Sequence, residues 1–289
     1  MATSNANAEL RTLLQTRLPA VKTAGCRFSP VQGLTGESWR IEGEGICLLA
    51  RQQTPDKSVL GVSRQREARL LRRSAVTLGP TVVAQNARWI IVEWLEGDVV
   101  TEAVFDQLRQ NGGLARLTAG LHQRPLSGYR LDLPRRYQHY WQHLDRRRIT
   151  PAWLRLQQRF LHAAAPQPLK LAPLHMDIHP DNMIAQPQRV RLIDWEYAAD
   201  GDVALELAAM FRFNAWSGEQ CQQFIEQYVQ YGYHDARRLT SQISHWLPWV
   251  DYLMLMWFEV RWQQSGESEF LRWAAALRQR FCLSLPRSE

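Results

Sequence analysis

Short apolar runs alternate with turn residues along the first third of the chain. β-Branched and aromatic residues are concentrated in these runs, and glycine or asparagine separates them, which is typical of strands in an antiparallel sheet. The expected strands cover residues 27–32, 38–42, 46–51, 81–85 and 88–93. One amphipathic helix is expected between them, over residues 59–74, because apolar positions there recur three and four residues apart. The pattern therefore predicts a small antiparallel sheet with one helix.

Beyond residue 97 the apolar positions recur mostly at helical spacing. The expected helices cover residues 102–123, 137–144, 151–164, 203–213, 219–231, 235–260 and 267–281. Residues 173–197 are an exception, because their prolines forbid a long helix and residues 190–194 have the pattern of a short strand. We therefore expect an α+β fold of two lobes, a small nucleotide-binding lobe over 1–95 and a larger, mainly helical lobe over 96–289. Ligands favour clefts between lobes, so a ligand is expected near residues 93–98.

Composition and charge narrow the class of protein. The chain has 289 residues, of which 45% are apolar, so it can bury a sizeable core. Its net charge of +7 invites a nucleic-acid interpretation. The arginines of residues 64–73, however, alternate with leucines at helical spacing, which is typical of a solvated helix face, and no nucleic-acid-binding motif accompanies them. We therefore rank nucleic-acid binding below an enzyme that handles phosphates.

Several features argue for a cytoplasmic protein. The cysteines form no CxxC pair, and residues 1–10 are polar, without the apolar segment of an export signal. The longest apolar stretch, residues 253–258, is too short to cross a bilayer. We expect no membrane partner, a small-molecule substrate and a monomeric state.

Residues 174–197 carry the candidate chemistry. Phosphoryl transfer from ATP needs an acceptor for the proton of the attacking hydroxyl and oxygen ligands for Mg²⁺. Asp177 suits the first task, and Asn182 and Asp194 suit the second, because a five-residue spacing can bring Asp177 and Asn182 to one point. Glu196 lies two residues beyond Asp194 on the same strand face, which makes it a possible second ligand for metal or water.

Two other interpretations fit some residues of this segment. A polar turn with capped helix ends would use some of the same residues, although the ordered set favours chemistry. A zinc site is suggested by His175 and His179, which stand four residues apart. Pro180 argues against a helix there, and no third ligand follows at a suitable spacing. We expect imidazole in this loop to hold the backbone by hydrogen bonds.

The first lobe supplies candidate nucleotide contacts. A turn between two expected strands would let backbone N–H groups approach phosphates, and its candidate residues are Gly33, Thr35, Gly36 and Ser38. Arg51 ends an alternating strand with a cation that can grip a phosphate, and Glu67 on the following helix can pair with it. An ordinary surface ion pair would look the same in the sequence. The backbone from Glu93 to Leu95 is expected to hydrogen-bond an adenine ring.

The H-x-D-x-x-x-x-N motif of His175, Asp177 and Asn182, followed by D-W-E-Y-A over residues 194–198, resembles the aminoglycoside phosphotransferase and choline kinase superfamily. The resemblance covers essentially the whole chain and implies a protein-kinase-like fold. It also implies that Asp177 is the base, that Asn182 and Asp194 hold Mg²⁺, and that Arg51 contacts the phosphates of ATP. The chain departs from most relatives in carrying arginine where they have the strand lysine, and in a short phosphate loop.

Within that superfamily the chain is most similar to the bacterial thiamine kinases. Residues 173–177, 192–198, 201–209 and 257–262 carry this similarity. It implies ATP-dependent phosphorylation of the primary hydroxyl of thiamine, giving thiamine phosphate, in vitamin salvage. Choline, an aminoglycoside or another small alcohol remains an alternative acceptor, and a catalytically silent nucleotide-binding protein or a basic nucleic-acid-binding protein remains an alternative of another class.

An acceptor pocket is expected along the helix predicted over residues 235–260. Thiamine carries a cationic thiazolium, which aromatic faces and a carboxylate hold well. Tyr252, Trp257 and Glu259 form the available set, and Glu196 and Asp177 are expected to contribute from the catalytic segment. Such a stripe is more often packing than binding, so the two interpretations stand side by side.

Overall fold

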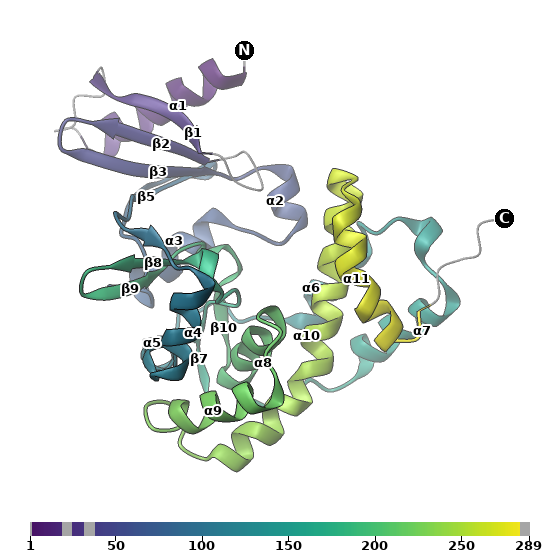
Figure 1. The fold of residues 1–289 in the computed structure, drawn as a ribbon. Helices are drawn as coiled ribbons and strands as arrows, with labels where there is room; N and C mark the ends of the chain where they lie inside the picture. Colours follow the sequence, from purple (N-terminus) through teal and green to yellow (C-terminus); the bar gives the residue numbers. More distant parts are fainter. Residues whose placement is uncertain (1, 19–24, 32–37, 284–289) are drawn as a thin grey trace.

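The structure is a computed structural model that describes residues 2–18, 25–31 and 38–283. A sheet with accompanying helices forms the N-terminal lobe, and a larger, mainly helical lobe follows it (Figure 1). The two-lobed α+β architecture expected from the sequence is confirmed. The boundary at residue 95 between a nucleotide-binding lobe and a catalytic lobe stays a prediction.

A five-stranded antiparallel sheet forms the N-terminal lobe, with its strands in the order β1-β2-β3-β5-β4. The strands are β1 (Arg27–Val31), β2 (Ser38–Gly43), β3 (Ile46–Gln52), β4 (Val82–Gln85) and β5 (Trp89–Glu93). All five lie close to the expected ranges. Arg51 of the central strand β3 pairs with Ile90 of β5, so the strand that carries the candidate phosphate contact is supported on both sides.

The helix expected over residues 59–74 is α3 (Arg64–Arg73), which begins five residues later than expected, and a separate short helix, α2 (Pro55–Val59), precedes it. The chain breaks between them because Gly61 adopts a left-handed conformation with φ of 73°. Ser63 then caps α3 by accepting a hydrogen bond from the backbone N–H of Arg66. The expected helix therefore starts later than predicted, and α2 before it was not expected.

A further helix, α1 (Ala2–Arg17), was missed by the sequence interpretation. Its leucines at positions 10, 13 and 14 are buried against one face of the sheet, where they meet Ile41 and Ile91. Their three- and four-residue spacing is a helical signal, but the polar residues before them concealed it.

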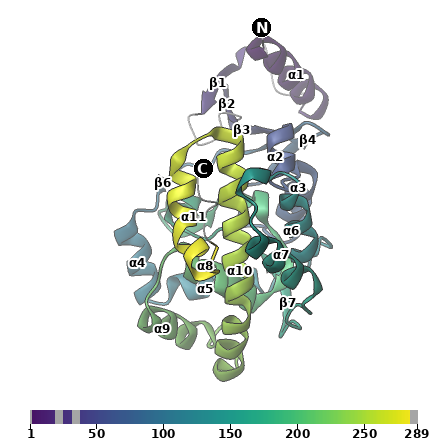
Figure 2. The ribbon, with the colours of Figure 1, turned by 90° about the vertical axis from the view of Figure 1, so that its right-hand side faces the viewer.

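Eight helices of the C-terminal lobe have the following bounds: α4 (Glu102–Gln110), α5 (Gly113–Leu121), α6 (Leu133–Trp141), α7 (Pro151–His162), α8 (Val203–Phe213), α9 (Gly218–Tyr228), α10 (Ala236–Ser265) and α11 (Ser268–Arg280). The helix expected over residues 102–123 is split into α4 and α5 at Gly112, which has a φ of 78°. The long α10 runs through the lobe with α11 beside it (Figure 2). Among the described residues, none of the helices combines the length and apolarity needed to cross a membrane.

Two small sheets lie in the C-terminal lobe and position the candidate site. One contains β6 (Asp98–Val99), β8 (Met183–Gln186) and β9 (Arg189–Leu192), and the other pairs β7 (Leu171–Leu174) with β10 (Ala199–Asp202). The strand expected over residues 190–194 ends at Leu192, before the left-handed backbone of Asp194. That turn directs the chain from β9 into the cleft between the lobes.

Two hydrophobic cores fill the molecule, and the N-terminal sheet separates them. Ile91 of β5 belongs to the smaller core under α1. Its neighbour Ile90 projects to the opposite face, where it joins Leu70 of α3 and the core of the helical lobe. Helix α3 is therefore packed as part of the larger body.

Candidate active site

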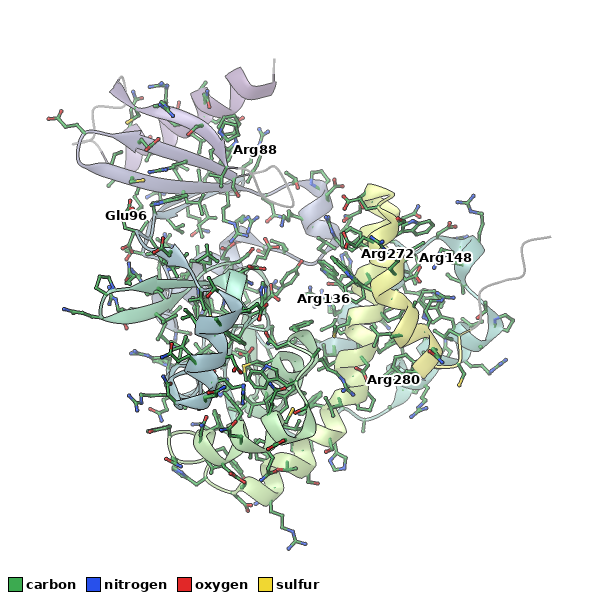
Figure 3. All side chains as sticks on the ribbon, viewed as in Figure 1. Arg88, Glu96, Arg136, Arg148, Arg272 and Arg280 are labelled. Carbon is green, nitrogen blue, oxygen red and sulfur yellow. The ribbon has the colours of Figure 1, made fainter. Side chains whose placement is uncertain are left out.

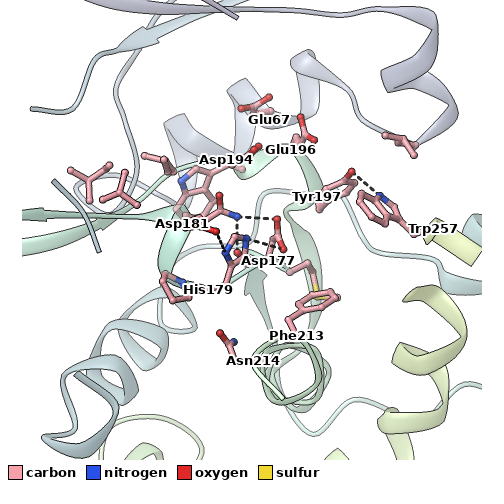
Figure 4. A pocket seen from close by; sticks show the side chains of 18 of the residues that line it. Glu67, Asp177, His179, Asp181, Asp194, Glu196, Tyr197, Phe213, Asn214 and Trp257 are labelled. Atoms are coloured by element: carbon pink, nitrogen blue, oxygen red, sulfur yellow. Dashed lines mark hydrogen bonds and ion pairs between the residues drawn. The ribbon is translucent and has the colours of Figure 1, made fainter. Parts of the chain in front are cut away.

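Asp177 and Asn182 lie at the two ends of the loop that joins β7 to β8. Asn182 belongs to a one-turn 3₁₀ helix, Pro180–Asn182. Its Nδ2 donates hydrogen bonds to Oδ2 of Asp177 at 2.9 Å and to the backbone oxygen of Asp177 at 3.0 Å (Figure 4). The five-residue spacing thus brings the two side chains to one point, as expected from the sequence.

The backbone just before Asp177 is held in a rarely used conformation. Met176 has a φ of 67°, which non-glycine residues seldom adopt. The carboxylate of Glu206 accepts hydrogen bonds from the backbone N–H groups of His175 at 2.6 Å and of Met176 at 2.7 Å. His175 Nε2 also lies 2.8 Å from the backbone oxygen of Ile193. The interpretation that this imidazole holds the backbone is confirmed.

Asp194 is brought to the same place by the backbone, because the N–H of Ile193 donates to the oxygen of Asn182 at 2.9 Å. Its own φ of 59° turns the side chain into the cleft, where 37% of it is exposed. Oδ1 accepts a 2.5 Å hydrogen bond from Nη2 of Arg51. Burial opposes ionisation of Asp194, but the charge of Arg51 outweighs it and lowers the pKa of the carboxyl to about 2. Asp194 is therefore anionic at any physiological pH.

Arg51 reaches from the N-terminal sheet to carboxylates of both lobes. Its Nη1 donates to Glu67 Oε1 of α3 at 2.9 Å, which is the pair expected from the sequence. Its Nη2 is shared between Asp194 and Glu196, the latter at 2.8 Å. Burial alone would lower the pKa of Arg51, but the surrounding carboxylates raise it, so the guanidinium stays charged. Its position beside Asp194 suits contact with phosphate oxygens.

Glu196 is the residue expected from the sequence as a possible second metal ligand. The residue is 4% exposed, and cations surround its carboxylate. Oε2 accepts hydrogen bonds from Arg51, from Lys57 at 3.0 Å and from Arg64 at 3.2 Å, while Oε1 accepts from Lys57 at 2.9 Å. Three of these bonds end on Oε2 and one on Oε1, so cations contact both oxygens of the carboxylate. In this arrangement Glu196 is paired with three cations, and its role as a metal ligand stays a prediction.

His179 lies within the same loop, between Asp177 and Asn182. Its Nε2 is 3.6 Å from Oδ1 of Asp177, and its Nδ1 is 3.8 Å from Oδ2 of Asp181. Burial alone would lower the pKa of His179, but these two carboxylates, Asp177 foremost, raise it above its usual value. The imidazole is therefore biased toward the protonated form next to Asp177.

A cavity of about 1590 Å³ opens between the lobes, and Asp177, Asn182, Asp194 and Arg51 line it. The expected adenine contacts line it too. The N–H groups of Glu93 and Trp94 donate to Thr81 and Cys47 oxygens, which leaves Leu95 as the position whose N–H these bonds do not use. The Glu93 side chain pairs with Arg191 at 3.0 Å.

Ser38 is the one residue of the expected phosphate loop that the structure describes, and it lines the cavity. The other candidates of that loop lie outside the described residues; they are Gly33, Thr35 and Gly36.

Comparison with known proteins decides the family. Residues 32–240 match the phosphotransferase enzyme family. The thiamine kinase of Escherichia coli O157:H7 is 38% identical over 253 residues, which cover 86% of this chain and 89% of that protein. The chain belongs to the phosphotransferase enzyme family. It is therefore an ATP-dependent phosphotransferase that acts on a small molecule.

Solved structures agree on the fold of this phosphotransferase. The choline kinase LicA from Streptococcus pneumoniae superimposes with a TM-score of 0.71 at 14% identity, over 96% of this chain and 99% of that one. A choline/ethanolamine kinase family protein from Mesorhizobium loti gives a TM-score of 0.68 at 18% identity, over 95% and 93% of the two chains. The protein-kinase-like fold implied by the sequence motifs is confirmed.

The residues expected to form an acceptor pocket do not all line the cavity. Trp257 lines the cavity, and its Nε1 donates to the hydroxyl of Tyr197 at 2.9 Å (Figure 4). Tyr252 is instead fully buried in the helical core, where its hydroxyl bonds to Gln157 at 2.5 Å. Helix geometry explains the difference, because Trp257 shares the cavity face of α10 with Leu253 and Arg261, whereas Tyr252 faces the opposite side.

Glu259 also lies away from the cavity, contrary to expectation. It is 2% exposed and bonds to Arg148 at 2.7 Å and Arg278 at 2.8 Å. Arg148 lies on the outer side of α10 and α11 (Figure 3). Glu259 therefore ties the helices of the C-terminal lobe together rather than facing an acceptor.

Sequence reasoning missed several residues that line the cavity. Lys57 is the most notable, because it is one of only three lysines in the chain and stands two residues after the Pro55 that begins α2. The scarcity of lysine in this arginine-rich chain could have marked Lys57 as a candidate site residue. Phe213, Asn214 and Trp216 also line the cavity, from the end of α8 and the turn after it, but nothing in their spacing distinguishes them from core residues.

Proposed function

We propose that this phosphotransferase transfers the γ-phosphoryl group of ATP to the primary hydroxyl of thiamine, giving thiamine phosphate. The convergence of Asp177, Asn182 and Asp194 opposite Arg51 in one interlobe cavity is the observation that carries the phosphoryl-transfer chemistry. The choice of thiamine rests on the curated thiamine kinase relative, which the chain matches along most of its length.

Asp177 is proposed as the group that accepts the proton of the acceptor hydroxyl. The Asn182 amide holds one of its oxygens at 2.9 Å, so the carboxylate is oriented before the substrate arrives. A hydroxyl placed within hydrogen-bond reach of the other oxygen would lose its proton as the new P–O bond forms. Protonated His179 beside Asp177 would stabilise the carboxylate in its charged form.

Asn182 and Asp194 are proposed as the residues that hold Mg²⁺. Mg²⁺ is usually bound by one or two protein oxygens together with substrate phosphates and water, rather than by a cage of side chains. The donor set fits this rule. Asn182 directs its nitrogen toward Asp177, so its side-chain oxygen is available, and Asp194 carries an ionised carboxylate partly open to the cleft. The ion would neutralise charge on the β- and γ-phosphates.

Arg51 is proposed as the phosphate contact from the N-terminal lobe, with Glu67 as the residue that orients it. Its guanidinium already lies 2.5 Å from Asp194, so phosphates held by an ion at Asp194 would lie within its reach. The backbone at Leu95 is proposed to bind adenine, and Ser38 with the phosphate-loop residues before it is proposed to cover the phosphates.

Trp257 and Tyr197 are proposed as the aromatic wall that receives the thiazolium cation. Their hydrogen bond fixes both rings on the C-terminal side of the cavity, near Asp177 (Figure 4). A cation over such a face gains about 0.5–2 kcal/mol, depending on how well it is desolvated. We further propose that the enzyme acts as a monomer in the cytoplasm, where ATP is available.

A coupled ATP-consumption assay over thiamine, choline, homoserine and two aminoglycosides tests this function. Thiamine should give the highest kcat/KM, and mass spectrometry should identify thiamine phosphate as the product. Asp177→Asn serves as the control for contaminating kinases. Preferential turnover of another alcohol would replace thiamine as the substrate, and binding of ATP without turnover of any acceptor would favour a silent nucleotide-binding protein.

A further inference from the structure

Lys57 lies on α2 and is buried at the interface between the lobes, with 5% of its surface exposed. Its Nζ donates to both oxygens of Glu196, at 2.9 and 3.0 Å. Few lysines are buried to this extent without a specific partner, and here the partner lies two residues after Asp194. The location calls for a role beyond packing.

Glu196 forms ion pairs with cations from three separate elements of the N-terminal lobe. Arg51 comes from β3, Lys57 from α2 and Arg64 from the first turn of α3. Glu67 and Asp194 complete the group, so three cations face three carboxylates and the buried charges balance. Arg51 is the member that the proposed function also requires for the phosphates of ATP.

The segment that carries Lys57 is attached to the C-terminal lobe. Gln264 of α10 donates to the backbone oxygen of Asp56 at 3.0 Å, and Tyr140 of α6 donates to that of Leu60 at 3.0 Å. His139 lies 3.1 Å from the backbone oxygen of Ser58. Lys57 is therefore fixed to the same lobe as Glu196, whereas Arg51 belongs to the N-terminal sheet.

We propose that Lys57 is a positioning residue that releases Arg51 for the nucleotide. When phosphates draw Arg51 away, Glu196 loses one buried cation. Lys57 provides two of the four hydrogen bonds on Glu196 and keeps that carboxylate neutralised, together with Arg64. Without Lys57, Glu196 would hold Arg51 more strongly, because an unpaired buried carboxylate is costly. The inference rests on the proposed role of Arg51 as a phosphate contact.

Nucleotide binding to the folded variants tests this proposal independently of thiamine. Isothermal titration with Mg²⁺ and the non-hydrolysable analogue AMPPNP should show a Kd about tenfold or more higher for Lys57→Met, the scale of losing a charge-assisted hydrogen bond. The double variant Lys57→Met/Glu196→Gln should recover most of that affinity, because it removes one cation and one carboxylate and restores the charge balance. Lys57→Arg should stay close to the wild type. Lys170→Met, which changes a lysine outside the cavity, is the matched control.

Recovery of AMPPNP affinity in the double variant is the decisive measurement. If Lys57 had a purely structural role, Lys57→Met would lower thermal stability, and the added Glu196→Gln change would not restore nucleotide affinity. A double variant that binds no better than Lys57→Met, or a folded Lys57→Met with the wild-type Kd, would overturn the proposal. If circular dichroism shows that Lys57→Met does not fold, Lys57→Gln takes its place, and an unchanged Kd there is equally decisive against it. A wild-type protein that fails to bind AMPPNP would instead contradict the proposed function.

Discussion

Asn182 Nδ2 donates a 2.9 Å hydrogen bond to Asp177 Oδ2, so the two oxygens of the Asp177 carboxylate have different partners. One oxygen is occupied by the amide, and the other, Oδ1, lies 3.6 Å from the His179 ring. The acceptor hydroxyl is therefore expected to approach Oδ1. This arrangement gives the proposed base a fixed direction in the absence of substrate.

Asp177→Asn is expected to lower kcat by about a hundredfold or more, because removal of a general base commonly costs that much. Nucleotide affinity should change little, since Asp177 faces the acceptor and not the proposed phosphate contacts. Steady-state kinetics and AMPPNP titration measure the two effects. A variant that keeps the wild-type kcat would exclude Asp177 as the base.

Asp194→Ala is expected to abolish Mg²⁺-dependent nucleotide binding, whereas Asn182→Ala should only raise the Mg²⁺ concentration needed for activity. A neutral amide oxygen is a weaker ligand than a carboxylate. Activity measured against Mg²⁺ concentration separates the variants. Superimposable curves for both variants and the wild type would remove these residues from the metal site.

His179 is expected to titrate above its usual value of about 6.5, and Asp177→Asn should move its pKa back toward that value. Because the folded pKa is raised, protonation of His179 stabilises the fold at pH below about 6.5, and this contribution is lost as pH rises through the raised pKa. Two-dimensional NMR of the imidazole resonances follows the titration. A pKa at or below 6.5 would show that burial outweighs the neighbouring carboxylates.

Trp257→Leu and Glu259→Gln are expected to behave differently, although both lie on α10. Loss of the Trp257 ring should raise KM for thiamine by about twofold to thirtyfold, the range of a cation–π contact, with little change in KM for ATP. Glu259→Gln should leave both KM values unchanged and lower the free energy of unfolding by about 3 kcal/mol or more, since it leaves buried arginines uncompensated. Denaturant titration and kinetics on the same preparations test the contrast.

Residues that lie close together along the chain were sufficient to predict the centre of the candidate site. Asp177 and Asn182 are close because a five-residue loop leaves them few alternatives, and Arg51 meets Glu67 because α3 lies only about a dozen residues beyond β3 and packs beside the same sheet. The strand bounds were recovered for a similar reason, since alternation and turn residues act over a few positions.

Long-range packing explains what the sequence could not supply. Tyr252, Trp257 and Glu259 share one helix, and the side that faces the cavity depends on how α10 packs against its neighbours. Glu196 has a carboxylate that suits a metal ion. Only the structure shows that Lys57 and Arg64, from other elements, already donate hydrogen bonds to its oxygens. Gly112 splits one expected helix into two, and Gly61 lies in the turn that delays the start of another until Arg64, because both glycines adopt a left-handed backbone that interrupts a helix.

The sheet that separates the two hydrophobic cores also determines which parts of the molecule unfold together. Ile90 and Leu70 from the first 95 residues are buried in the core of the helical lobe, so severing the chain near residue 95 would expose that surface on both pieces. Heating should therefore melt α3 and the helical lobe in one cooperative transition. Among the residues that the structure describes, the core under α1 shares none with that body, and amide exchange should show that this layer opens first.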